Sequence, residues 1–123
     1  MLLNLSNHKY KTWSPAQLEA AKQQFTKVKD FSFPDIPPQW NSQQILTKAE
    51  EIISKIMVKH NDELKNKTLN ILLNGEQSFI IHFYLLCKKH KIACYVATSE
   101  RNTTQNKDGS KTIHFHFNQF RKV

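Results

Sequence analysis

Residues 68–79 read Thr-Leu-Asn-Ile-Leu-Leu-Asn-Gly-Glu-Gln-Ser-Phe and join three structural signals in one short stretch. The apolar run at residues 69–73 is nearly continuous, which is typical of a strand covered on both faces. A polar loop with one glycine follows, and Ser78 is expected to begin a helix over residues 79–90. A strand that passes through a short loop into a helix is the repeating unit of α/β domains.

The same alternation runs along the rest of the chain. Apolar runs predict further strands at residues 1–5, 28–33 and 92–97. Ser14 and Pro15 suit a helix start, and a second helix is expected from Asn41 or Ser42 that frays in the polar residues 60–67. Beyond the polar residues 98–102, polar and apolar residues alternate at positions 112–118, and Asp108-Gly109 just before them is a strong hairpin signal.

These signals predict one α/β domain over residues 1–123. We expect a small Rossmann-like sheet that is mostly parallel, with a C-terminal antiparallel hairpin and helices on both faces. The length of 123 residues, with 39% hydrophobic and 11% aromatic residues, suits one globular domain. The balance of 18 Lys and Arg against 10 Asp and Glu gives a net charge of +8 and indicates an anionic partner.

The sequence also bears on location. Cys87 and Cys94 lie in apolar surroundings and are expected to be buried free thiols, as in cytosolic proteins. The first residues lack the pattern of a signal peptide. No apolar stretch reaches the roughly 20 residues that cross a bilayer, so we expect a cytoplasmic protein without a membrane partner.

Three polar clusters each follow an apolar run, at residues 4–8, 74–78 and 98–102. If the three runs are neighbouring parallel strands, all three clusters emerge at the edge where open α/β sheets bind ligands. The candidate ligand-binding residues are therefore Asn4, Ser6, Asn7, His8, Asn74, Gly75, Gln77, Ser78, Ser99 and Asn102, and the candidate catalytic residues are Glu76, Glu100 and Arg101.

Each cluster has a plausible chemistry and a simpler explanation. Gly75 allows a ligand close to the backbone, and the helix start at Gln77 and Ser78 suits phosphate, although a helix cap with a turn glycine is the favoured explanation for this motif taken alone. Arg101 suits a phosphate and Glu100 a ribose hydroxyl or a general base, or the two form a surface pair. The amides and hydroxyls of the first cluster suit adenine edges or sugars, and a turn explains them almost as well.

Metal chemistry has little support in the sequence. His114 and His116 share one face of a strand, but no Cys or carboxylate stands at a supporting spacing, which favours solvated strand positions. The motifs of metallohydrolases and serine esterases are missing. We therefore predict no metal and no cofactor.

Five short motifs resemble small CRISPR-associated proteins of type III systems. They are Leu-Asn-Leu-Ser-Asn-His at residues 3–8, Trp-Ser-Pro-Ala-Gln-Leu-Glu-Ala-Ala at 13–21, Phe-Pro-Asp-Ile-Pro-Pro at 33–38, Gly-Glu-Gln-Ser-Phe at 75–79 and Thr-Ser-Glu-Arg-Asn at 98–102. The similar proteins are stand-alone relatives of the CARF (CRISPR-associated Rossmann fold) domain, including ring nucleases. The chain departs from their pattern at Ser78 and Ser99, where threonine is more usual.

This resemblance implies a homodimer that binds cyclic oligoadenylate, the messenger of type III CRISPR immunity, with cyclic tetra-adenylate as the favoured ring. It also implies metal-independent ring opening by a ribose 2′-hydroxyl, with Arg101 neutralising charge and Glu100 or Glu76 orienting the hydroxyl. One alternative is a binder that sequesters the messenger uncut. The other is a basic nucleic-acid module, which would expose aromatics such as Phe115, Phe117 and Phe120; core packing explains these more simply, so a polymer is not the favoured partner.

Overall fold

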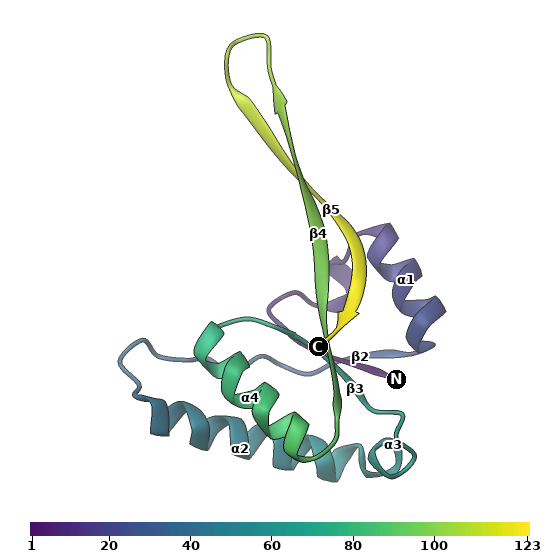
Figure 1. The fold of residues 1–123 in the computed structure, drawn as a ribbon, viewed down its shortest axis with the longest axis vertical. Coiled ribbons are helices and arrows are strands. Elements are labelled where there is room, and N and C mark those ends of the chain that lie inside the picture. The colour runs from purple at the N-terminus through teal and green to yellow at the C-terminus, as the bar shows by residue number, and fades with distance from the viewer.

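A five-stranded sheet in the order β2-β1-β3-β4-β5 organises the chain (Figure 1). The computed structural model describes residues 1–123. The strands are β1 (Leu2–Ser6), β2 (Val28–Asp30), β3 (Asn70–Asn74), β4 (Ala93–Gln105) and β5 (Lys111–Lys122). The first four are parallel and β5 is antiparallel to β4, so the predicted α/β sheet with a closing hairpin is confirmed.

Helices cover both faces of this sheet. They are the short 3-10 helix η1 (Tyr10–Thr12), α1 (Pro15–Phe25), α2 (Ser42–Lys59), α3 (Asn61–Lys65) and α4 (Gln77–Lys89). Alternate residues of the strands divide between two cores. Leu3, Leu5 and Ile71 pack under α2 and α4, whereas Leu2 and Leu72 pack with Phe25 of α1.

Two helix starts follow the predicted local chemistry. The Ser14 hydroxyl accepts a hydrogen bond from the Gln17 amide at 3.3 Å, and Pro15 takes the first helical position. At α2, the Asn41 side chain accepts from the Gln44 amide at 3.0 Å, and the Gln44 side chain accepts from the Asn41 amide at 2.8 Å. This reciprocal pair is a capping box.

Two elements differ from the sequence-based expectation. The strand β2 ends at Asp30, and a segment without regular secondary structure follows at residues 31–37, ahead of a turn at residues 38–39; this connection contains the prolines. The segment expected to fray after α2 instead forms α3. Asp62 and Glu63 suit its first turn, and Leu64 packs against the larger core, which favours this extra helical turn.

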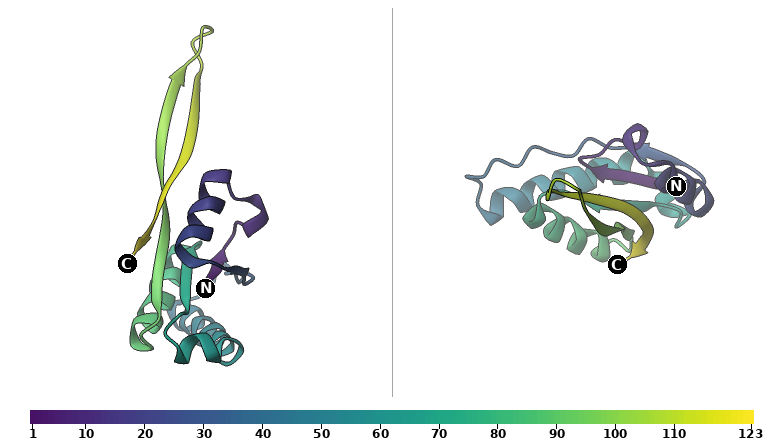
Figure 2. Two further views of the ribbon diagram at one scale, coloured as in Figure 1. Left: turned by 90° about the vertical axis from the view of Figure 1, so that its right-hand side faces the viewer. Right: turned by 90° about the horizontal axis from the view of Figure 1, so that it is seen from above.

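The strand β4 continues to Gln105 instead of ending near residue 97, because the polar cluster at residues 98–102 pairs with β5. β4 pairs with β3 only as far as Tyr95. Beyond that point β4 and β5 form a two-stranded ribbon that projects far from the body, as Figure 1 and the left view of Figure 2 show. We call residues 99–117 the arm. Its turn uses Gly109 at φ +89°, as the Asp-Gly signal predicts.

A β-bulge at the base of the arm sets which side chains share a face. Thr98 pairs with Gln119 and Ser99 pairs with Phe117, so Asn118 is an extra residue in β5. Because of this extra residue, Phe117 and Phe120 face the same way although they are three positions apart. Phe120 is buried, Phe117 is half-buried and Phe115 is exposed, so the expected core packing holds fully for Phe120 alone.

Cys87 on α4 and Cys94 on β4 are free thiols buried in the larger core, as predicted. A hydrogen bond with the Cys94 thiol, together with burial, raises the pKa of Cys87. None of the helices combines the length and the apolar character that a membrane crossing requires.

Candidate functional site

The carboxyl ends of β1 and β3 lie side by side, with Ser6 and Asn74 in register. From β1 the chain passes through α1 to β2 on one side, and then through α2 to β3 on the other side. The connections therefore change direction between β1 and β3. Crevices at such a point are where open α/β sheets bind ligands, so the first two clusters meet where the sequence led us to expect.

A hollow of about 290 Å³ opens here on the side of α1. We call it the α1-side hollow. Four residues predicted from the sequence line it: Ser6, His8, Asn74 and Ser99. The rest of its lining consists of Thr12, Trp13, Ser14, Gln17, Leu72, Ala97, Thr98, Phe115 and Phe117. His8 is the one histidine among these lining residues, and no Asp, Glu, Lys or Arg side chain lines the hollow.

Other predicted residues line two neighbouring hollows. Gly75 and Gln77 border an apolar hollow of about 500 Å³ beside α4, which Asn74 also reaches. Asn7 lies in a third hollow of about 270 Å³ near β2, together with Lys9 and Asp30. The first two clusters therefore surround one sheet edge. Ser6, His8 and Asn74 share the α1-side hollow, whereas Asn7, Gly75 and Gln77 line the two neighbouring hollows.

Asn4 differs from its expected role as a ligand-binding residue. It is 1% exposed, and its Nδ2 donates to the His8 carbonyl and to Asp30 Oδ1, both at 2.8 Å. Its Oδ1 accepts from the Ser6 hydroxyl at 2.6 Å. Because both amide N–H groups are used inside the chain, Asn4 holds the loop after β1 and has no donor free to read a base.

The His8 backbone carbonyl fixes this loop further. Besides the Asn4 amide, it accepts from the Ser6 hydroxyl at 3.1 Å and from Trp13 Nε1 at 3.1 Å. The His8 amide in turn donates to the Ser6 oxygen at 3.2 Å. The loop is therefore a preorganised wall of the α1-side hollow, and His8 is held at its rim with an exposed side chain.

Glu76 caps α4, a position that we had expected Ser78 to hold. Its carboxylate accepts from the Ser78 amide at 3.1 Å and from the Phe79 amide at 2.8 Å. The Ser78 hydroxyl and these amides lower the pKa of Glu76. Of the two amides expected to hold phosphate, Gln77 and Ser78, the Ser78 amide is therefore already occupied by the protein's own carboxylate.

Gly75 is required by packing. A Cβ at this position would come within 2.2 Å of the Phe33 ring, which lies over the glycine and in edge-to-face contact with Phe79. We expected the missing side chain to admit a ligand. Instead, Phe33 from the segment after β2 occupies that space.

Glu100, Arg101 and Asn102 lie within β4 on the arm, so the expectation of a loop at the strand end is wrong for them. Neighbouring residues of a strand face opposite ways, which separates Glu100 from Arg101. Arg101 stands opposite Phe115, while Glu100 stands opposite His116 and accepts from Asn118 Nδ2 at 3.1 Å. None of the three residues lines the hollows at the sheet edge.

No group of three or more His, Cys, Asp or Glu side chains is arranged to hold a metal ion. His114 and His116 stack on one face of the arm with ring centroids 6.3 Å apart.

A protein-family model matches residues 1–121, and its description reads "Uncharacterized protein MJ1673 family". The chain belongs to the MJ1673 family. The match begins before β1 and ends within β5, so the matched residues include the whole arm. Neither a curated protein nor a solved structure matches the chain.

Sequence reasoning missed several lining residues of this MJ1673-family chain. Trp13 and Gln17 flank the start of α1, and Phe115 and Phe117 come from β5. The period-two pattern of the last strand predicts that both phenylalanines lie on one face, and this was the one sequence signal that could have pointed to them. The β-bulge that turns this face toward α1 has no recognisable pattern in the sequence.

Proposed function

We propose that the protein binds a cyclic oligoadenylate at the α1-side hollow and opens its ring without a metal ion. The observation that carries this proposal is the position of the hollow between β1 and β3, where Ser6 and Asn74 meet. Its volume of about 290 Å³ suits one nucleotide unit of a larger ring, the rest of which extends into solvent. The net charge of +8 favours a polyanionic ligand.

The polar groups of the hollow suit a nucleotide. Asn74 is exposed and offers an amide donor and acceptor, and Ser99 offers a hydroxyl. Lys9 in the adjoining hollow supplies a positive charge near the same edge. Adenine edges, ribose hydroxyls and phosphates therefore all find matching groups within this region.

The proposed reaction is attack by a ribose 2′-hydroxyl on its own 3′-phosphate. The 2′-oxygen forms a bond to phosphorus, the bond from phosphorus to the 5′-oxygen breaks, and a 2′,3′-cyclic phosphate results. Alignment of the attacking hydroxyl contributes about 7 to 11 kcal/mol in well-oriented intramolecular reactions. Proton transfer from the 2′-hydroxyl and to the leaving 5′-oxygen requires a group that titrates near neutral pH.

His8 is the residue to which we assign this proton transfer, because it lines the hollow and the expected carboxylates do not. Glu76 is engaged in capping α4, and Glu100 lies on the far face of the arm. Arg101 shares a face with Phe115, which does line the hollow, so it remains our candidate for neutralising phosphate charge.

A homodimer in the cytoplasm completes the proposal. A symmetric ring presents the same groups to two subunits, so each subunit would hold half of it. On α4, Ile81 and Leu85 are 60% and 58% exposed and lie one helical turn apart. This apolar strip adjoins the hollow of about 500 Å³ beside α4, which Ile81 also lines, and we assign the strip to contact with a second copy of the chain. Buried free thiols at Cys87 and Cys94 agree with a reducing compartment.

The enzymatic claim is tested by incubating the purified protein with cyclic tri-, tetra- and hexa-adenylate in excess chelator and separating the products by chromatography. We expect linear products that end in a cyclic phosphate, and a loss of at least about a hundredfold in rate for His8→Ala. His90→Ala is the matched control, because His90 lies at the end of α4, outside the hollow. Rings of every size left intact would refute ring opening.

One observation favours the sequestering function as a second candidate. His8 is the one acid–base side chain that lines the α1-side hollow, and a site that only stores the messenger needs no acid–base groups. Titration calorimetry separates the two functions. Tight binding of cyclic tetra-adenylate with an uncut ring after hours of incubation would select sequestration.

A further inference from the structure

We propose that the arm provides a base-stacking surface for the nucleotide in the α1-side hollow, with Phe115 stacking on the adenine and Arg101 contacting an adjoining phosphate. This inference rests on the proposed function and names the part of the ligand that the arm recognises. It makes the arm a wall of the binding site.

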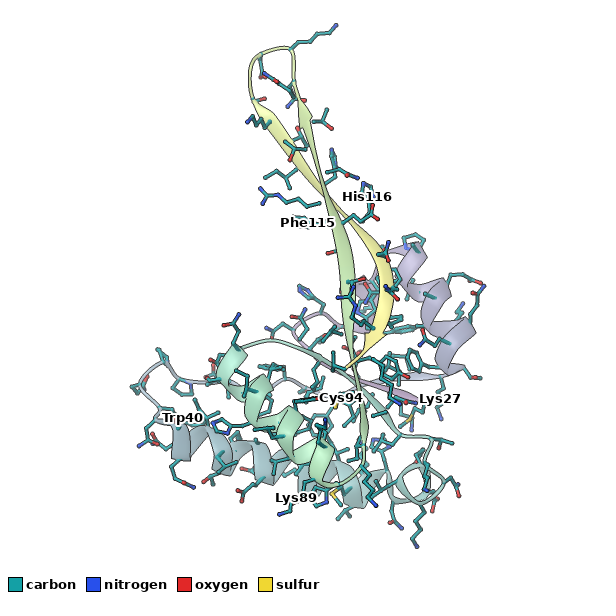
Figure 3. All side chains as sticks on the ribbon, viewed as in Figure 1. Lys27, Trp40, Lys89, Cys94, Phe115 and His116 are labelled. Atoms are coloured by element: carbon teal, nitrogen blue, oxygen red, sulfur yellow. The ribbon has the colours of Figure 1, made fainter.

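The exposure of Phe115 is the first observation. Its side chain is 68% exposed, yet it lines the hollow together with Phe117. Figure 3 shows Phe115 part-way along the arm, near the level of the upper end of α1. The core of the domain does not use this ring. A planar base of similar size would cover its exposed face and would fit the hollow that the ring borders.

The pairing register gives the second observation. Arg101 stands directly opposite Phe115, and Ser99 stands directly opposite Phe117. Side chains that are directly opposite in an antiparallel pair share a face, with Cβ atoms about 4.5–5.5 Å apart. A guanidinium, an aromatic ring and a hydroxyl therefore lie together on the face that looks toward the hollow. This combination of stacking and cationic contact is typical of binding to unpaired bases.

The base of the arm is anchored to the body on the same side. The Phe117 and Phe120 rings have centroids 5.0 Å apart, and Phe120 lies 5.9 Å from Trp13, which also lines the hollow. These aromatic contacts connect the start of the arm to the loop that holds His8. The stacking surface is thus held in place next to the strand ends.

A single strand of RNA is the competing occupant of this face. The arm has three cations, Arg101, Lys107 and Lys111, against Glu100 and Asp108, so its charge alone suits either ligand. The cyclic nucleotide is favoured because Phe115 and Phe117 face a hollow that Ser6 and Asn74 close from below. A surface that binds a long single strand would not need polar residues at the bottom of such a hollow.

The test compares Phe115→Leu, Phe115→Tyr and the wild type in titrations with cyclic tetra-adenylate. Loss of one stacked base weakens binding by about 1–3 kcal/mol, so we expect the Leu variant to bind about 5- to 150-fold more weakly and the Tyr variant to bind nearly normally. Arg101→Gln should weaken binding about tenfold, with a smaller dependence on salt. His116→Ala is the matched control on the opposite face of the same strand.

A second readout shows stacking directly. In Phe115→Trp, the added indole fluorescence should be quenched on binding the ring, relative to the wild type. Circular dichroism checks that each variant folds, which the exposure of Phe115 leads us to expect.

The outcomes are distinct. A wild type that binds no cyclic oligoadenylate overturns the proposed function. If the wild type and Phe115→Leu bind the ring with equal affinity, the stacking surface is overturned and the proposed function is left intact. The inference is also overturned if the wild type binds an oligoadenylate RNA of about 20 nucleotides more tightly than any ring and Phe115→Leu loses this RNA binding. That result would assign the arm to a polymer.

Discussion

At the scale of single residues, two positions expected to contact a ligand have structural roles. Asn4 is buried and its side chain makes three hydrogen bonds within the chain, and the missing side chain of Gly75 leaves the space that the Phe33 ring occupies. Both residues were found by position, because strand ends in α/β sheets do gather polar groups. Their partners, Asp30 and Phe33, lie far away in sequence, and no local sequence pattern predicts such contacts. Sequence reasoning therefore located the edge correctly but could not tell supporting residues from lining residues.

Gly75→Ala should destabilise the protein by about 1–3 kcal/mol, because the added methyl group forces the Phe33 ring to shift within a packed region. The measurement is the free energy of unfolding from denaturant titration. In the Phe33→Leu background, where the clashing ring is absent, the same change should cost much less. An equal cost in both backgrounds would show that the glycine is required for another reason.

At the scale of elements, the starts of α1 and α2 were the most predictable features and the length of β4 was the least. Ser14, Asn41 and Gln44 act through neighbours within three residues, so their signals are local. The polar residues 98–102 resemble a loop, but a ribbon solvated on both faces also accepts polar side chains. Only the pairing with β5 distinguishes the two, and that pairing depends on residues 113–119.

Glu76→Ala should destabilise the protein by about 1 kcal/mol through loss of the cap on α4, whereas Glu76→Gln should lose less because one oxygen acceptor remains. The folded protein lowers the pKa of Glu76 below its ordinary 4.5. The contribution of the charge is therefore fully present above that value and is lost as the pH falls through the lowered pKa. Unfolding titrations from pH 7 to pH 3 should show the wild type and Glu76→Gln converging at the acid end.

A constant stability difference between these two proteins across that pH range would contradict the role of the Glu76 charge. It would leave the geometry of the cap unaffected.

At the scale of the whole molecule, the apolar strip on α4 predicts the oligomeric state. Leu85→Asp should shift a dimer toward monomer by at least a tenfold increase in the dissociation constant, because a carboxylate would be buried at the interface. Light scattering coupled to size-exclusion chromatography measures this change. Val58→Asp is the matched control, since Val58 is an exposed apolar residue on a different helix. A wild type that stays monomeric at high concentration would rule out the dimer.

The arm leaves β5 as the outer strand of the sheet, with one edge unpaired along its whole length. Such an edge invites a strand from another molecule, and proteins guard it with charge. Lys111, Arg121 and Lys122 stand on this strand, and the chain as a whole repels its copies through its net charge of +8. A bound polyanion or concentrated salt weakens that repulsion, so we expect edge-to-edge association of β5 to be easiest under either condition.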